Sequence, residues 1–370
     1  MDNGLEANIL QSTVLAGNYC IGCGVCATVP GSPFRIKMDD FGNYVAFIDK
    51  TETFDDGLRL LDVCPFSGKS KNEDEIGDLL FPDVKKDKFI GKYLKCYAGY
   101  VSKGDFREKG SSGGFGKWLA HILLKEREVD FFVQIASNST SRSDVPLFDY
   151  KVYSCADEVI MGSKSSYYPT SLTNVIEHIR STDGRFAISG VPCFIKSIRL
   201  LSLKDPVVAQ RVKFAIGIVC GGMKSANQSK MIGWQLGVHP DNLVAIDFRG
   251  KDKDKPASHK VYKAWSNKDD LVRCRLDREL IGSDYGAGYF KPNACDFCDD
   301  VVGETADISL GDAWLPQYVQ DYRGTSIVVV RNRKLLNVIE RYRDEGVVCL
   351  DEISKDDVIK SQEGGLRHRR

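Results

Sequence analysis

The spacing of cysteines near the N-terminus constrains this chain more than any other feature of its sequence. Cys20, Cys23 and Cys26 form a C-x-x-C-x-x-C pattern, and the intervening Gly22 and Gly24 permit a tight loop. Three thiolates at this spacing suit three corners of a 4Fe-4S cube, whose fourth ligand is then a more distant cysteine followed by proline. The segment therefore predicts a metal-binding loop that needs one more thiolate from elsewhere in the chain.

Cys64, which precedes Pro65, supplies that fourth thiolate. Zinc sites more often use separated C-x-x-C pairs than three evenly spaced cysteines, so the pattern favours a 4Fe-4S cluster, with zinc as the alternative. The segment resembles a bacterial ferredoxin motif, except that Pro30 stands where the usual fourth cysteine would be and no second cysteine run follows. We therefore expect one cluster here, held by the first cysteine set: Cys20, Cys23, Cys26 and Cys64.

A second group of four cysteines is expected at one edge of a sheet. Cys193 and Cys220 each follow a short apolar run typical of a buried strand, and Cys295 and Cys298 form a C-x-x-C pair. Residues just past the C-termini of parallel strands gather along one edge, where cofactors usually bind. A C-x-x-C pair alone fits zinc, a redox disulfide or an iron–sulfur cluster. Four thiolates together favour a cubane or a structural zinc, and these four residues are the second cysteine set.

Composition limits the class of protein and its partners. The chain has 370 residues, which predicts two or three domains, and twelve cysteines, which in a reducing compartment are more often metal ligands than disulfides. Lys+Arg and Asp+Glu both number 51, which argues against nucleic acid as a main partner. The N-terminus resembles no signal peptide and no apolar run is long enough to span a bilayer, so we expect a cytoplasmic protein.

Alternating strand-like and helix-like segments predict an α/β fold, α+β overall, with a mainly parallel sheet. The expected strands are 129–136, 185–190, 213–219, 243–248, 261–266, 271–276, 307–310, 326–330 and 347–350, and the expected helices begin near 115, 172, 194, 224 and 334. We expect a small ferredoxin-like domain and connection over 1–95, in which the charged stretch 70–95 is a surface connection. The main domain is expected to have an N-terminal part over 96–180 and a C-terminal part over 181–370.

Two small polar loops at predicted helix starts are candidate anion sites. Ser111, Ser112, Gly113 and Gly114 precede an apolar helical pattern, so their backbone N–H groups and the helix dipole suit a phosphate, with ordinary N-capping as the alternative. Gly162-Ser163-Lys164-Ser165 forms a second such loop, where Lys164 is either a phosphate contact or a solvated surface lysine. The charged segment 249–260 is expected to be solvated surface, with a lid or an anionic-substrate contact as the alternative.

Six stretches taken together resemble the beta-subunit family of coenzyme F420 hydrogenases and dehydrogenases, over about residues 96 to 330. They are Ser111–Phe115, Gly162–Lys164, Gly190–Cys193, Gly217–Gly222, Cys295–Cys298 and Ala306–Trp314. The resemblance implies FAD and a 4Fe-4S cluster held by the second cysteine set. It also implies flavin contacts from Ser111, Ser112, Gly113, Gly114, Ser163, Lys164, Ser165, Gly190 and Asp312. The N-terminal ferredoxin-like segment is an attachment shared by many members.

The resemblance implies an iron–sulfur flavoprotein oxidoreductase that relays single electrons through two 4Fe-4S clusters to FAD, for two-electron hydride chemistry on a small substrate. The expected partners are ferredoxin or another electron donor, a substrate such as a sugar derivative or a deazaflavin, and a second copy of the chain. The chain looks most similar to bacterial members of surface-polysaccharide synthesis. One alternative is a non-catalytic electron-transfer subunit of a larger complex, and another is a zinc-stabilised binding protein. No side chain stands out as a catalytic acid or base.

Overall fold

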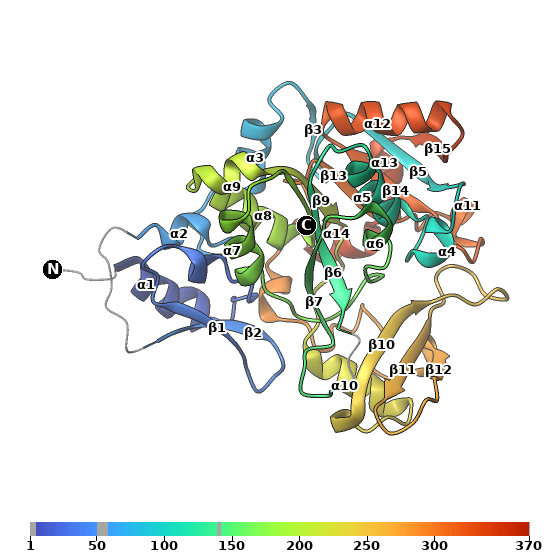
Figure 1. The fold of residues 1–370 in the computed structure, drawn as a ribbon, viewed down its shortest axis with the longest axis horizontal. Coiled ribbons are helices and arrows are strands. Elements are labelled where there is room, and N and C mark those ends of the chain that lie inside the picture. Colours follow the sequence, from blue (N-terminus) through green and yellow to red (C-terminus); the bar gives the residue numbers. More distant parts are fainter. Residues whose placement is uncertain (1–4, 50–57, 139–141, 370) are drawn as a thin grey trace.

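The computed structural model describes residues 5–49, 58–138 and 142–369, and it is organised around one large sheet covered by helices on both faces (Figure 1). Eight strands form this sheet, in the spatial order β15-β5-β14-β13-β9-β8-β6-β7. In that order they are β15 (Val348–Ile353), β5 (Lys95–Val101), β14 (Ser326–Val330), β13 (Ile308–Asp312), β9 (Val212–Ile218), β8 (Phe186–Gly190), β6 (Phe131–Ser137) and β7 (Phe148–Tyr153). The α/β class predicted from the sequence is confirmed.

The large sheet is mixed, so the expectation of a mainly parallel sheet is wrong for its outer strands. The four central strands β13, β9, β8 and β6 pair in parallel. On one side β14, β5 and β15 are antiparallel to their neighbours, and on the other side β7 is antiparallel to β6. The chain passes from β13 to β14 without a full crossover helix, and such a connection joins antiparallel strands.

Helices cover both faces because the strands are apolar on both sides. β14 is buried at all five positions, as expected for a β-branched run inside such a sheet. On one face, α5 (Phe115–Lys125) and α12 (Arg333–Asp344) share a core with Tyr97, Ile216 and Val328. On the other face lie α7 (Thr173–Ser181), α8 (Pro192–Ser202), α9 (Pro206–Arg211), α13 (Lys355–Ser361) and α14 (Glu363–Arg369).

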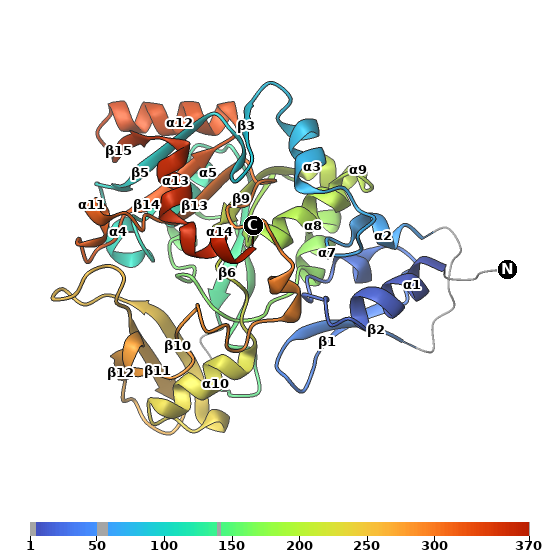
Figure 2. The same ribbon diagram turned by 180° about the vertical axis from the view of Figure 1, so that it is seen from behind.

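A smaller sheet lies beside the large one, at the bottom of Figure 1 and, seen from behind, of Figure 2. Its three antiparallel strands are β10 (Leu243–Gly250), β11 (Val261–Ser266) and β12 (Arg273–Leu276), and α10 (Ala226–Gln235) shares their core. The predicted charged loop 249–260 begins inside β10 and leads to β11, so its first two residues are part of a strand. The other short elements after residue 95 are α4 (Phe106–Lys109), α6 (Ala156–Val159), η3 (Pro240–Asn242), η4 (Asp277–Glu279), η5 (Asn293–Asp296) and α11 (Pro316–Val319).

The N-terminal segment packs directly against the main domain. Its elements are α1 (Leu5–Leu10), η1 (Gln11–Leu15), η2 (Val25–Thr28), β1 (Phe34–Met38), β2 (Tyr44–Ile48), α2 (Leu60–Val63), α3 (Glu73–Leu80), β3 (Lys85–Asp87) and β4 (Gly91–Tyr93). Cys23 and Val63 share a core with Leu172 of the main domain, whose backbone N–H donates to the Cys23 carbonyl at 2.8 Å. Lys196 of α8 pairs with Glu73 of α3 at 3.0 Å.

The stretch 70–95, expected to be a surface connection, contains regular secondary structure. It contains α3 and the β3–β4 pair, and α3 starts with a capping box in which Asn72 and Glu75 cap each other's backbone N–H groups. The Asn-x-x-Glu spacing was a readable helix-start signal. The domain boundaries stay proposals, and residues on both sides of the expected 180/181 boundary contribute strands to the same sheet. Across the described part of the chain, no helix has the length and apolar character needed to cross a membrane.

Candidate functional site

The C-terminal ends of the central strands meet at one edge of the large sheet, as expected for parallel pairing. β8, β9 and β13 run in the same direction, so the segments that follow them emerge on the same side. Cys193 is the second residue of α8, just after β8, Cys220 follows β9, and Asp312 ends β13. Cys295 lies in η5, and the segment after it returns to this edge through a hydrogen bond from the Cys220 N–H to the Val301 carbonyl, at 2.9 Å.

The structure brings the second cysteine set together. Burial raises the pKa of the Cys193 thiol well above its ordinary value, and the nearby charges of Cys298, Cys220 and Cys295 raise it further. The sulfurs also receive backbone donors. The Gly222 N–H lies 3.3 Å from the sulfur of Cys220, and the Met223 N–H lies 3.3 Å from that of Cys295.

The first cysteine set lines one pocket, together with apolar side chains such as Val14, Ile36 and Phe66. Burial is the main reason that the pKa of Cys23 rises to about 11 and that of Cys64 to about 12, and neighbouring thiols add to both shifts. The N–H of Ala46, on β2, lies 3.3 Å from the sulfur of Cys20.

Gly24 is required in this loop for two reasons. Its φ of 84° is unfavourable for other residues, and a Cβ there would lie 2.4 Å from the hydroxyl oxygens of both Ser171 and Thr173. The loop therefore approaches the start of α7 closely.

The donor chemistry of both cysteine sets is that of a metal site. Within residues 5–49, 58–138 and 142–369, no three Cys, His, Asp or Glu side chains are placed to hold a metal ion. Four thiolates buried together also need a compensating positive charge, and N–H donors to sulfur are typical of iron–sulfur sites. The ligand role of these eight cysteines stays a prediction.

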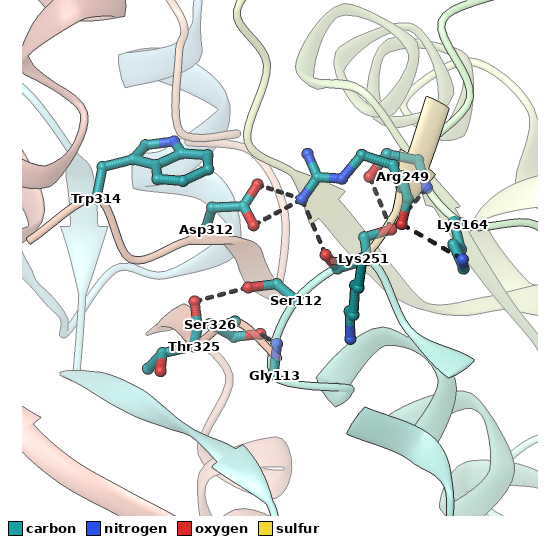
Figure 3. A network of polar contacts seen from close by, with 12 residues as sticks. Ser112, Gly113, Lys164, Arg249, Lys251, Asp312, Trp314, Thr325 and Ser326 are labelled. Carbon is teal, nitrogen blue, oxygen red and sulfur yellow. Dashed lines mark hydrogen bonds and ion pairs between the residues drawn. The ribbon is translucent and has the colours of Figure 1, made fainter. Parts of the chain in front are cut away.

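The Ser/Gly loop, residues 111–114, precedes α5 and makes hydrogen bonds to the start of β14 and to the second polar loop. Ser112 donates from its hydroxyl to the Thr325 carbonyl at 2.7 Å, and the Gly113 N–H donates to the hydroxyl of Ser326 at 3.0 Å (Figure 3). The hydroxyl of Ser111 accepts from the Ser165 N–H at 2.7 Å, so the two predicted polar loops touch. Gly114 has φ 88° and is the first residue before α5. The structure thus joins Ser111, Ser112, Gly113, Gly114 and Ser165 in one place.

Arg249, near the end of β10, lies beside the Ser/Gly loop and makes several hydrogen bonds there. Its guanidinium donates to both carboxylate oxygens of Asp312 at 2.7 and 2.8 Å and to the Ser111 carbonyl at 3.0 Å (Figure 3). It also donates to the Tyr167 hydroxyl at 3.1 Å, while its buried Nε has no partner among the described residues. Burial alone would raise the pKa of Asp312, but the charges of Arg249 and Lys260 and the hydrogen bonds from Arg249 and Ser112 together outweigh it, and the pKa of Asp312 is lowered. Asp312 is therefore paired with Arg249 in this structure.

Three lysines, each buried or half-buried, add positive charge around the loop. Burial, with a smaller contribution from the neighbouring charge of Arg249, lowers the pKa of Lys260 to about 7. Lys251 and Lys117 have pKa values lowered to about 8, again mainly by burial. Lys251 donates to the Arg107 carbonyl at 2.5 Å and Lys117 to the Ile160 carbonyl at 2.6 Å. The Lys260 ammonium makes no hydrogen bond or ion pair within the described residues, and it lies 5.7 Å from the Trp314 ring centre.

The other predicted flavin contacts lie close to this network or at the same sheet edge. Lys164 is not a free surface lysine, because it donates to Asp247 at 3.0 Å and to the Arg249 carbonyl at 3.3 Å. The backbone N–H of Ser163 donates to the Ile135 carbonyl at 3.1 Å. Gly190 ends β8, where a Cβ would lie 3.1 Å from the Tyr150 hydroxyl oxygen.

Sequence reasoning missed the cations that this site uses. Arg249, Lys251 and Lys260 fall in the segment expected to be solvated surface, yet Arg249 and Lys260 are buried. The alternative for that segment, a lid or an anionic-substrate contact, stays a prediction. A readable signal was the position of Arg249 directly after the apolar run of β10, since strand ends carry binding residues.

Comparisons with known proteins matched two family models and a solved structure. Residues 96–177 match a family model for the N-terminal part of the coenzyme F420 hydrogenase/dehydrogenase beta subunit, and residues 183–356 match the model for its C-terminal part. Among solved structures, one similar chain comes from the F420-reducing [NiFe] hydrogenase complex of Methanosarcina barkeri, in a xenon-derivatised crystal. The TM-score is 0.57 and the identity 16%, over 77% of this chain and 92% of that chain, which shows a shared fold. No curated protein sequence matches the chain.

Proposed function

Because this chain belongs to the coenzyme F420 hydrogenase/dehydrogenase beta-subunit family, we propose that it is an iron–sulfur flavoprotein oxidoreductase. The observation that carries the proposal is the meeting, at one sheet edge, of a cysteine set and a cationic Ser/Gly loop. Family membership by itself indicates a redox subunit of the hydrogenase and dehydrogenase kind. The cofactors, the substrate and the electron donor are the parts that we add.

The first and second cysteine sets would each hold one 4Fe-4S cluster, and the Ser/Gly loop would hold FAD. When bound, these groups would supply single-electron carriage and its conversion to two-electron hydride chemistry. The chain's own residues support this assignment through N–H donors to sulfur at Ala46, Gly222 and Met223.

The Ser/Gly loop favours an anionic ligand such as the FAD pyrophosphate. Arg249, Lys251 and Lys260 bring three basic side chains to the loop, and among the described residues the carboxylate of Asp312 is paired with one of them, Arg249. A phosphate there would restore the charge that burial removes from Lys260, since a nearby anion stabilises the ammonium form. Lys164 and Asp247 neutralise each other, so Lys164 is better suited to orienting the loop than to holding a full negative charge.

The substrate and partners follow from the resemblance and not from the geometry. We propose ferredoxin or a similar protein as the electron donor and a small molecule as the substrate. A sugar derivative in surface-polysaccharide synthesis and a deazaflavin are the two candidates.

One observation favours a second candidate function, a non-catalytic electron-transfer subunit. The similar solved chain belongs to a multi-subunit F420-reducing hydrogenase complex. A subunit of that kind would carry the same cofactors but show no substrate turnover alone.

The deciding experiment quantifies iron, sulfide, zinc and flavin on anaerobically purified protein. Two cubanes and one flavin require about eight irons, eight sulfides and one FAD per chain. Cys23→Ala and Cys295→Ala should each lower the iron content by about half, because each removes one of the four thiolates that its cluster needs. Cys155→Ala is the matched control, since Cys155 is exposed and belongs to neither set, and it should leave the iron content unchanged. Zinc without iron or flavin would refute the proposed function.

A further inference from the structure

Two tyrosines lie between the Ser/Gly loop and the second cysteine set. Arg249, beside the loop, donates to the Tyr167 hydroxyl at 3.1 Å. The Tyr167 ring packs edge-on against the Tyr285 ring, with 5.0 Å between their centres. The Tyr285 ring in turn lies against the backbone next to Cys220, since a Cβ added at Gly221 would be 3.2 Å from a ring carbon. The two rings therefore connect the candidate phosphate loop with a predicted cluster ligand.

The hydroxyl of Tyr285 is a buried polar group without a partner. Its oxygen makes no hydrogen bond to any residue in the described part of the chain. Tyr167 is close enough to influence the pKa of this phenol, but the two hydroxyl groups do not form a hydrogen bond of acceptable geometry. The Nε of Arg249 is likewise buried and unpaired. Buried polar groups in folded proteins are nearly always paired, so two unpaired groups beside one loop indicate a ligand that accepts hydrogen bonds.

The position of Tyr285 is fixed by its ring and not by its hydroxyl. The Lys224 ammonium lies 4.7 Å from the centre of the ring, and it donates to the Tyr289 carbonyl at 2.6 Å. Tyr167 contacts the same ring. These contacts need only the aromatic ring, so the hydroxyl is available to a ligand.

Glycines border the segment that carries Tyr285. Gly282 has φ 82° and Gly288 has φ 67°, values that favour glycine over other residues. Glycine at both ends gives this segment backbone freedom, and small residues of this kind often act as hinges beside a binding site. The segment can therefore adjust its position when a ligand binds against Tyr285.

We propose that Tyr285 is a binding residue for the flavin ring, with its hydroxyl donating to an acceptor on that ring. This inference rests on the proposed function, since it requires FAD on the Ser/Gly loop. A ring that extends from the loop toward the second cysteine set meets Tyr167 and Tyr285, whose aromatic surfaces suit stacking. A phenol can donate to the carbonyl oxygens or ring nitrogens of a flavin. Hydrogen bonds to the ring are one means by which a protein tunes its electronics.

The test compares FAD binding and stability in Tyr285→Phe, which keeps the ring and removes the hydroxyl. The dissociation constant for FAD, titrated into iron-loaded, flavin-free protein, should rise about tenfold, as the loss of one hydrogen bond predicts. The midpoint potential of the bound flavin should fall, because a donor favours the state with more negative charge. The urea midpoint of the flavin-free variant should not fall, because the lost hydroxyl has no partner there.

Two controls locate the effect. Tyr289→Phe makes the same chemical change in the same segment, where the side chain is 52% exposed, and it should alter neither FAD affinity nor flavin potential. ADP, which has a pyrophosphate group and no flavin ring, should compete with FAD equally well in wild type and in Tyr285→Phe. An equal loss of affinity for ADP and FAD would overturn the contact with the ring.

The outcomes separate this inference from the proposed function. Wild-type protein that binds neither iron nor flavin would overturn both. Wild-type protein with iron and FAD, together with a Tyr285→Phe variant of unchanged FAD affinity and flavin potential, would overturn the role of Tyr285 alone. A lowered urea midpoint in flavin-free Tyr285→Phe would show that the hydroxyl stabilises the fold, and would also overturn that role.

Discussion

Arg249 and Asp312 form a buried ion pair that joins the small sheet to the large one. The guanidinium side chain is 5% exposed and donates to both oxygens of the carboxylate. Arg249 is the last residue but one of β10 and Asp312 ends β13, so the pair fixes the distance between two elements that are far apart in the sequence. The Ser/Gly loop lies directly against this pair through the Ser111 carbonyl. The geometry of the candidate flavin site therefore depends on it.

Removal of the carboxylate should destabilise the fold. Asp312→Ala leaves Arg249 buried without its partner, and breaking a buried pair in this way typically costs about 3–5 kcal/mol. Urea denaturation of cofactor-free protein measures the loss. The control is Asp105→Ala, which removes the acid of an exposed pair with Lys109 and should cost no more than about 1 kcal/mol.

The stabilisation by Asp312 should also depend on pH. Because the pKa of Asp312 is lowered, its contribution to the free energy of unfolding is full above the ordinary aspartate range and is lost as pH falls through the lowered pKa. A constant difference between wild type and variant down to strongly acidic pH would contradict the assignment.

Gly113 should not tolerate even a methyl group. A Cβ at this position would lie 2.4 Å from the Gly99 carbonyl oxygen and 2.8 Å from the Ser326 N–H nitrogen, and backbone atoms cannot move aside cheaply. Gly113→Ala should therefore lower the midpoint of urea denaturation and weaken FAD binding. Gly116→Ala, three residues later in α5, is the matched control. There the nearest atom is 4.0 Å away, and alanine should stabilise the helix by about 0.4–1 kcal/mol. Equal effects of the two changes would argue against the close packing of this loop.

Lys260 should make stability depend on pH in the alkaline range. Its pKa is about 7 in the folded protein and near 10.4 when unfolded, so between these values the unfolded chain binds more protons. Stability should then rise as pH increases from 7 to 10. Lys260→Met should stabilise the cofactor-free protein at pH 7, on the order of 1–3 kcal/mol, with the gain disappearing near pH 10. Lys253→Met, in the exposed part of the same loop, should change neither stability nor its slope with pH. A gain from Lys260→Met that is the same at pH 7 and pH 10 would contradict the lowered pKa.

Removal of iron should loosen the N-terminal segment before the rest of the fold. The first cysteine set lines a pocket between η2, β2 and α2, and metal binding contributes directly to the stability of such a site. After chelation under mild oxidation, we expect faster amide hydrogen exchange over residues 20–26 and 60–66. Exchange in α12, which packs on the opposite side of the large sheet, is the internal control and should stay unchanged. Uniform acceleration along the whole chain would show that the metal stabilises the fold globally.

Many secondary-structure elements could be read from local patterns. The strand predicted at 326–330 coincides with β14 and the one at 261–266 with β11, because β-branched and alternating apolar residues mark strands directly. The helix predicted near 334 is α12, whose N-cap Asn332 accepts from two backbone N–H groups. β5 and β7 were not predicted. Gly99 interrupts the apolar pattern of β5, and tyrosines alternate with charged residues in β7, so neither has a clear strand signal.

The cysteine spacing identified both candidate ligand sets, but it could not indicate how near they are to each other. That relationship depends on the packing of the N-terminal loop against α7 and α8, where Cys23 shares a core with Val175 and Phe194. Such contacts join residues more than a hundred positions apart, and no local pattern encodes them.

The sequence by itself determined the α/β class, the two cysteine sets and the polar loops at helix starts, because these rest on the chemistry and spacing of neighbouring residues. Only the tertiary structure decided the mixed direction of the large sheet and the role of segment 249–260. A charged segment is the same in sequence whether it faces solvent or an ion pair. Burial against Asp312 and the Ser/Gly loop, which turns Arg249 and Lys260 into site residues, is a property of the folded chain alone.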